Sequence, residues 1–274
     1  MQVWHANGRR PRILHTMVRV TDVDAALRFY TGGLGMTVLD RWNVSSRQGT
    51  VHCLGYDTSD GGCLQLLHDP DARDPCSHGS GYGHVSIGVP DLPAVVARLE
   101  AMGAEISLPP TRLLANGPHL SFVKDPEGYS LELLEFDPRS WVGGTRTSRP
   151  RFMHTMIRVR DMDAAVRFYR DGLGMQLLDR IEVEARRATA QFLGYDDYNG
   201  WCMEVVRSWD AREPYSHGSG YGHVAIGSPD VGAMVARLAA MGIETVLHSA
   251  RAGAGSAVAS VRDPEGYSLE LMRI

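Results

Sequence analysis

The chain has 274 residues, 43% of them hydrophobic and 22% charged, which is the length and composition of a soluble globular protein with about two domains. Its net charge is −4, from 28 Lys and Arg against 32 Asp and Glu, so it lacks the basic excess that is typical of nucleic-acid binders. No apolar run approaches the roughly 18 residues that a membrane span requires. Neither nucleic acid nor a membrane is therefore an expected partner.

The N-terminal segment and the cysteines indicate the compartment. Residues 1–14 contain basic residues with no apolar core behind them, so they do not resemble a signal peptide. Cys53, Cys63 and Cys76 lie in the first half of the chain and only Cys202 lies in the second. Because a disulfide framework would be less uneven, we predict reduced thiols and a cytoplasmic protein.

The chain is a tandem repeat. Shifted by 139 positions, residues 12–41 align with residues 151–180, and 20 of these 30 positions are identical. Two shorter segments recur unchanged: HGSGYGHV at residues 78–85 and 217–224, and DPEGYSLEL at residues 125–133 and 263–271. A unit of this length in two copies indicates duplicated domains, since solenoid repeats are shorter and more numerous. The predicted divisions are a first domain (12–137), a linker rich in Pro, Gly, Ser and Thr (138–150), and a second domain (151–274).

Within each half, one pattern of elements occurs twice. The first half begins with an alternating strand, an N-cap at Asp22 and a helical run that a Gly-rich segment ends; three strand-like runs follow, and the pattern then restarts. These runs are residues 15–20 (strand), 23–30 (helix), 36–42, 49–56 and 62–68 (strands), 83–89 (strand), 91–103 (helix) and 129–135 (last strand). The chain thus contains four strand–helix–three-strand units, numbered one to four, and its predicted fold class is α+β.

Strand alternation places polar residues on the side of each strand that faces away from the helices. Val85 suits packing under a helix, and its neighbour His84 therefore points to the other side. In the last strand of the same unit, Leu131 faces the helices and Glu132 points away from them. An ionised Glu on an inward face is costly unless it is paired or binds a metal.

Equivalent positions of the four units carry a His on the first strand and a carboxylate or amide on the last. The first-strand residues are His15, His84, His154 and His223, and the last-strand residues are Gln65, Glu132, Glu204 and Glu270. Two His and two Glu from a pair of units would form a metal site whose N and O donors suit Ni, Zn, Co, Mn or Fe. We predict one divalent metal per site, with at least one site occupied.

The motifs LHTMVRV, FY…GLGM, YGHVSIG and DPEGYSLEL, repeated in order in the second half, resemble those of glyoxalase I (lactoylglutathione lyase) in the vicinal-oxygen-chelate superfamily. The resemblance covers nearly all of both halves and points to a tandem two-domain form. It implies four βαβββ modules that pair into two open, curled sheets of eight strands, and it makes the first-strand His and last-strand Glu the metal ligands.

The resemblance leaves two ways to pair the modules. In glyoxalase I dimers each site takes one module from each subunit, and a fused version would pair unit two with unit three and unit one with unit four. Site I would then be His84, Glu132, His154 and Glu204, and site II would be His15, Gln65, His223 and Glu270. If each half folds on itself instead, units three and four form the complete site. Either pairing leaves one intact site and one that contains Gln65.

The resemblance implies a metal-dependent isomerase. Its substrate would be the hemithioacetal of a 2-oxoaldehyde, such as methylglyoxal, with glutathione or another thiol, and its product a 2-hydroxyacyl thioester formed through a metal-bound enediolate. Glu132 is the expected base of site I, with Glu204 as the opposing carboxylate, and Glu270 is the equivalent base of the other site. Gln65 can ligate a metal through its amide oxygen but accepts no proton at neutral pH, so site II is expected to be weaker.

Two other functions stay open. His15, His223 and Glu270 make a two-His, one-carboxylate set like that of non-haem Fe(II) oxygenases, which occur in the same superfamily. An antibiotic-binding member is a further alternative, although such members generally lack the ligands that are retained here at seven of eight positions.

Substrate contacts and partners follow from the same resemblance. Arg19 and Arg158, four residues after His15 and His154, match an Arg that binds the glutathione carboxylate in the family, while partners at Asp22 and Asp161 are the competing interpretation. The expected partner is a small molecule, and the chain is expected to be a monomer with an internal pseudo-dimer or a loose homo-oligomer.

Overall fold

The computed structural model describes residues 10–44, 49–56, 62–71, 75–114, 117–136, 149–196, 200–248 and 258–274. Most of the predicted linker at 138–150 therefore lies outside the described residues, and the domain boundaries stay a prediction. None of the helices formed by these residues is long and apolar enough to cross a membrane.

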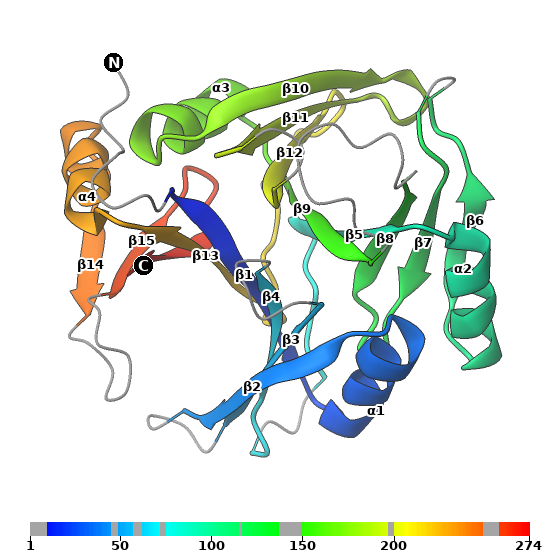
Figure 1. Ribbon diagram of the computed structural model, residues 1–274. Helices are drawn as coiled ribbons and strands as arrows, with labels where there is room; N and C mark the ends of the chain where they lie inside the picture. Colours follow the sequence, from blue (N-terminus) through cyan, green and yellow to red (C-terminus); the bar gives the residue numbers. More distant parts are fainter. Residues whose placement is uncertain are drawn as a thin grey trace.

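The strands of the described residues form two sheets of eight, and the order of the strands shows which units meet (Figure 1). Sheet A has the order β14-β15-β16-β13-β1-β4-β3-β2 and joins units one and four. Its strands are β1 (Arg12–Val20), β2 (Thr37–Asn43), β3 (Thr50–Gly55), β4 (Cys63–His68), β13 (Tyr221–Ser228), β14 (Thr245–His248), β15 (Val258–Arg262) and β16 (Ser268–Arg273).

Sheet B has the order β10-β11-β12-β9-β5-β8-β7-β6 and joins units two and three. Its strands are β5 (Tyr82–Val89), β6 (Ile106–Thr111), β7 (Leu120–Lys124), β8 (Ser130–Glu135), β9 (Arg151–Arg158), β10 (Gln176–Val183), β11 (Ala188–Gly194) and β12 (Cys202–Ser208). The exchanged pairing of modules is thus the one that forms, and neither half folds on itself. The two open sheets confirm the α+β class.

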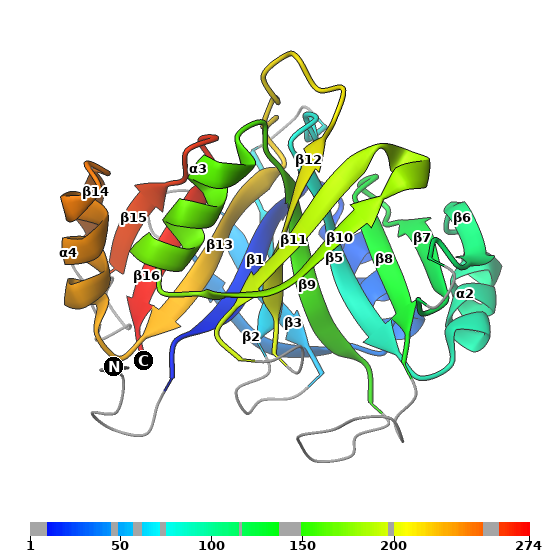
Figure 2. The same ribbon diagram turned by 90° about the horizontal axis from the view of Figure 1, so that it is seen from above.

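Four short helices cover the sheets, and α2 and α4 lie at opposite ends of the molecule in Figure 2. They are α1 (Val23–Leu27) with a π-helical turn at Arg28–Gly33, α2 (Leu92–Ala101), α3 (Met162–Arg167) with a π-helical turn at Phe168–Gly172, and α4 (Val231–Ala240). Each begins at an Asp whose carboxylate accepts the N–H of the residue three positions later, as the sequence predicts for Asp22. The π-helical turns carry the chain through the Gly-rich segments that end α1 and α3.

The two sheets share one hydrophobic core. Val85, Leu131 and their neighbours on alternate positions are buried on the helix side, as alternation predicts. Tyr30, in the turn after α1, donates a 2.8 Å hydrogen bond to Asp125, so the helix of unit one is tied to unit two of the other sheet. Thr16 and Thr155, on the strands at the centres of the two sheets, are joined by a 2.6 Å hydrogen bond. Each half therefore contributes to both sheets, and the fold needs both halves.

One prediction from the sequence is wrong. Cys53 on β3 and Cys63 on the adjacent β4 form a disulfide, with Cα atoms 5.9 Å apart, whereas reduced thiols were expected; Cys76 and Cys202 are free. Uneven numbers of cysteines between the halves argue against a framework of several bridges. They say nothing about one bridge between two strands of the same half, and that bridge depends on strand pairing.

Candidate metal centres

Site I brings together the four residues predicted for it. His84 comes from β5, Glu132 from β8, His154 from β9 and Glu204 from β12. The Nε2 atom of His154 lies 3.1 Å from Nε2 of His84, 3.0 Å from Oε2 of Glu132 and 3.1 Å from Oε2 of Glu204. The Nε2 atom of His84 lies 3.6 and 3.4 Å from the same two oxygens. Four side chains from four strands thus converge at one place, and three of them, His84, Glu132 and His154, form a group that could hold a metal ion.

Strand register explains this convergence. Ser86, on β5, is paired with Glu132 on β8 and with His154 on β9. These two ligands therefore lie at the same level, on the strands at either side of β5. Glu204 lies two positions along β12 from Cys202, the partner of His154. Because neighbouring side chains in register share a face, these residues all project from the concave side of sheet B.

The charges of site I are strongly coupled. Burial acts to lower the pKa of His154, but the carboxylates of Glu204 and Glu132 outweigh it and raise that pKa to about 10. Burial likewise opposes the charged form of the two carboxyl groups, yet the two His hold the pKa of Glu132 well below its usual range and lower that of Glu204 to about 2. The pKa of His84 is raised as well, by Glu132 and Glu204 against its burial. These groups therefore hold opposite charges inside a buried site.

The residues present fit a divalent cation. Oε2 of Glu132 is buried and finds no hydrogen bond of good geometry, although two His nitrogens lie close to it. Each His nitrogen lies near both carboxylates rather than pairing with one of them. Two imidazoles with two carboxylates are a common donor set for Zn, Ni, Co, Mn and Fe.

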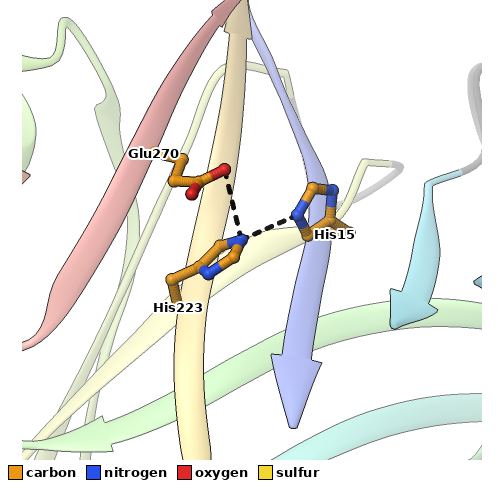
Figure 3. Close-up of side chains that lie close together, drawn as sticks. All are labelled: His15, His223 and Glu270. Carbon is orange, nitrogen blue, oxygen red and sulfur yellow. Dashed lines mark hydrogen bonds and ion pairs between the residues drawn. The ribbon is translucent and has the colours of Figure 1, made fainter. Parts of the chain in front are cut away.

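Site II differs from site I in the position of its fourth residue. Nε2 of His223 lies 3.0 Å from Nε2 of His15 and 3.5 Å from Oε2 of Glu270 (Figure 3). These three residues form a second group that could hold a metal ion. The amide nitrogen of Gln65, however, lies 3.1 Å from Nδ1 of His15, the ring nitrogen that faces away from this group. Gln65 thus orients His15 in this structure, and its role as a ligand stays a prediction.

The residues that flank the two sites also differ, and the sequence analysis did not identify them. Phe122 and Phe192 are paired with Glu132 and Glu204 on the neighbouring strands, and their rings lie 5.2 and 5.5 Å from the rings of His84 and His154. At site II the equivalent positions are Ser260, opposite Glu270, and Cys53, opposite Gln65. Extending the alternation argument by one strand would have found these residues. Site I therefore has aromatic rings at two positions where site II has Ser260 and Cys53.

The two predicted substrate-binding arginines lie near the Gly-rich loops rather than beside the Asp residues weighed as partners. One guanidinium nitrogen of Arg158 donates to the carbonyls of Ser80 and Tyr82, at 3.2 and 3.3 Å. Nε of Arg19 is buried without a hydrogen-bond partner among the described residues. Arg158 lies two alternate positions after His154 on β9, so it projects from the same concave face as site I. Both roles in substrate binding stay predictions.

The pKa directions predict that metal binding releases protons mainly at site I. A pKa of about 10 keeps His154 protonated at pH 7 in the metal-free protein, and His154 must lose this proton to bind a metal. The pKa of His15 is instead lowered by burial and by His223, so His15 is already neutral. Calorimetry of Ni²⁺ binding in buffers of different ionisation enthalpy is expected to give about one proton or more in His223→Ala, where only site I remains, and fewer in His154→Ala. Equal release in the two variants would contradict this assignment of charge.

Comparisons with known proteins agree with the fold. The family profile described as the Glyoxalase/Bleomycin resistance protein/Dioxygenase superfamily matches residues 12–133 and 151–271. A lactoylglutathione lyase of Arabidopsis thaliana is 31% identical over 229 residues, which are 83% of this chain and 77% of that protein. A lactoylglutathione lyase of Oryza sativa subsp. japonica is 28% identical over 276 residues, 96% of this chain and 89% of that protein. The crystal structure of glyoxalase I from Zea mays superimposes with a TM-score of 0.85 at 27% identity, covering 96% of this chain and 92% of that one. The chain belongs to the Glyoxalase/Bleomycin resistance protein/Dioxygenase superfamily and, within it, to the glyoxalase I (lactoylglutathione lyase) family in its tandem two-domain form.

Proposed function

We propose that site I isomerises the hemithioacetal of a 2-oxoaldehyde, with methylglyoxal and glutathione as the first substrates to test. The observation that carries the proposal is the convergence of four side chains on the concave face of sheet B. The Nε2 atoms of His84 and His154 lie 3.1 Å apart, and each lies 3.0–3.6 Å from Oε2 of Glu132 and of Glu204. The relatives in Arabidopsis and rice that are named lactoylglutathione lyase support it.

The four residues of site I would hold one divalent ion, and Ni, Zn, Co, Mn and Fe all suit their donor atoms. When bound, such an ion would polarise the carbonyl and hydroxyl oxygens of the hemithioacetal and acidify its C1 proton. Phe122 and Phe192 flank His84 and His154 and give the ligands apolar neighbours on both sides.

The two carboxylates perform the proton transfer in this proposal. Glu132 takes the proton from C1 of the substrate, and the same proton or its equivalent is delivered to C2, so the aldehyde carbon is oxidised and the ketone carbon reduced without an external electron carrier. Glu132 is suited to this role because it is buried beside His84 and His154, the two imidazoles that would hold the ion next to the substrate. Glu204, on β12, is the opposing carboxylate of site I, and in this proposal it transfers protons at the opposite face of the substrate.

The assembly and location form part of the same proposal. Each site draws its residues from two halves of one chain, so a monomer can contain both sites without a second copy. The cytoplasmic location was predicted from the sequence partly because reduced thiols were expected. The disulfide between Cys53 and Cys63 takes away this support, and the location stays a prediction.

Site II favours a second candidate function. Its described group contains two His and one carboxylate, the set that non-haem Fe(II) oxygenases use, and Gln65 contacts Nδ1 of His15 instead of joining that group. An oxygenase would consume dioxygen in the presence of Fe(II), whereas the isomerase needs none.

The test measures both reactions on the same protein. After metal removal, the chain is reloaded with Ni²⁺, Co²⁺ or Zn²⁺ and assayed for thioester formation from methylglyoxal and glutathione, and it is reloaded with Fe²⁺ and assayed for oxygen uptake. Thioester formation with at least one ion is the expected result. No turnover with any of these ions, together with oxygen uptake with Fe²⁺, would overturn the isomerase in favour of the oxygenase.

A further inference from the structure

Arg186 reaches across the open side of sheet B. It closes the short 3₁₀ turn Glu184–Arg186 between β10 and β11, and its guanidinium carbon lies 5.2 Å from the centre of the Phe122 ring on β7. In the sheet, β12, β9, β5 and β8 separate β11 from β7. A contact between strands so far apart in the order exists only because the sheet curls, and Figures 1 and 2 show the β10–β11 hairpin approaching the β6–β7 end. The side chain therefore spans the concave face.

This contact places Arg186 above site I. The Phe122 ring touches Arg186 and also meets the ring of His84 at 5.2 Å in an edge-on arrangement. Phe122 is paired with Glu132 in the register of β7 and β8. An aromatic ring is a favourable platform for a guanidinium group. Phe122 thus lies between the guanidinium group of Arg186 and the ring of His84, a predicted metal ligand.

Arg158 lies at the same end of the concave face. The register pairs Arg158 with Val206 and Ala188 with Ser208, so the hairpin that carries Arg186 begins two positions beyond the level of Arg158 on β12. Two guanidinium groups therefore lie toward one end of the face that carries Phe122, Phe192 and the residues of site I. This charge distribution suits a substrate with an apolar reacting end and an anionic tail.

The charge of Arg186 is available to a ligand. Its side chain is exposed, and the ion pairs of the described part of the chain do not include it. The adjacent Arg187 differs, because it makes a two-point contact with Asp210 at 2.7 and 2.9 Å. Arg187 is thus a matched control for the charge of this hairpin.

Among the described residues, this contact between an Arg and a Phe occurs at site I and has no counterpart at site II. The residue equivalent to Phe122 in the second half is Ser260, which offers no aromatic platform beside site II. The residue equivalent to Arg186 in the first half is Arg47, which lies outside the described residues.

We propose that Arg186 is a substrate-binding residue of site I that recognises a carboxylate on the thiol part of the substrate. Its planar guanidinium group, held on Phe122, can donate two parallel hydrogen bonds to one carboxylate, which an ammonium group does less well. The inference rests on the proposed isomerase function and adds Arg186 to the residues that select for a carboxylate on the thiol.

The test compares two thiols on the Ni²⁺-loaded holoenzyme: glutathione, and its dimethyl ester, which lacks the carboxylate charges. Arg186→Gln is expected to raise the KM for the glutathione adduct by about tenfold with little change in kcat, and to leave the ester adduct unaffected. Arg186→Lys is expected to fall between, and Arg187→Gln to match the wild type. An unchanged KM in Arg186→Gln, or an equal loss with both thiols, overturns the proposal.

The measurements distinguish a failure of the proposed isomerase activity from a failure of the proposed role of Arg186. If the wild type turns over neither adduct, the isomerase is excluded, and calorimetry with S-methylglutathione still reports on Arg186. Binding about tenfold weaker in Arg186→Gln than in wild type supports recognition of the carboxylate, and equal binding overturns it.

Discussion

Glu132→Gln is expected to lower kcat for the methylglyoxal–glutathione adduct by about a thousandfold, because a positioned general base contributes 10²–10⁴-fold in typical enzymes. The amide oxygen of Gln can still ligate a metal, so the metal content at site I is expected to fall little. The expected fall in kcat therefore reflects the loss of proton transfer and not the loss of the metal. Steady-state kinetics on protein whose metal content has been measured would show a reduced kcat with metal retained.

Glu270→Gln is the matched control for this variant. Glu270 occupies the equivalent position on β16, opposite Ser260, and belongs to site II. The kcat of this variant is expected to stay within about twofold of wild type, since site II has Gln65 in place of the second carboxylate, and has Ser260 and Cys53 where site I has Phe122 and Phe192. A large loss of kcat in Glu270→Gln, with kcat retained in Glu132→Gln, would show that the reaction takes place at site II and not at site I.

His154→Ala is expected to remove the metal of site I and to destabilise the metal-free protein by about 3–5 kcal/mol, because it leaves two buried carboxylates facing His84 alone. Metal analysis is expected to show one ion per chain fewer than in wild type, and urea unfolding of the metal-free proteins measures the stability. His223→Ala provides the comparison at site II. Its expected cost is smaller, because it disturbs only one carboxylate, that of Glu270.

The stability difference between metal-free wild type and His154→Ala depends on pH in a predictable way. The pKa of His154 is raised from 6.5 to about 10, so its contribution is fully present below pH 6.5 and is lost as the pH rises through 10. The pKa of Glu204 is lowered from 4.5 to about 2, so its contribution is present above pH 4.5 and is lost as the pH falls through 2. The difference is therefore expected to be greatest between pH 4.5 and 6.5. A difference that grows from pH 6.5 to pH 10 would contradict the pairing of His154 with the carboxylates.

The sequence alone predicts much of site I. The repeat aligns His84 with His15, His154 and His223, and alternation puts each on the face away from the helices, where the structure has them. These inferences succeed because they depend on short-range periodicity. The pairing of units two and three depends on contacts between distant strands, and only the resemblance to a family offered it as one of two choices.

What the sequence could not predict depends on neighbours across strands. The disulfide joins Cys53 and Cys63 because β3 and β4 are adjacent, and no local pattern shows this. The rotation of Gln65 toward Nδ1 of His15 is set by side-chain geometry within site II. The approach of Arg186 to Phe122 requires the curl of a whole sheet.

The central claim is that site I, built from units two and three, is sufficient for the isomerase reaction. The most direct test removes site II with the double change His223→Ala and Glu270→Gln, loads the chain with one equivalent of Ni²⁺, and measures kcat for the methylglyoxal–glutathione adduct. Turnover within about twofold of the fully loaded wild type is the expected result. Loss of turnover in a chain that is folded and holds its single Ni²⁺ ion would contradict the claim.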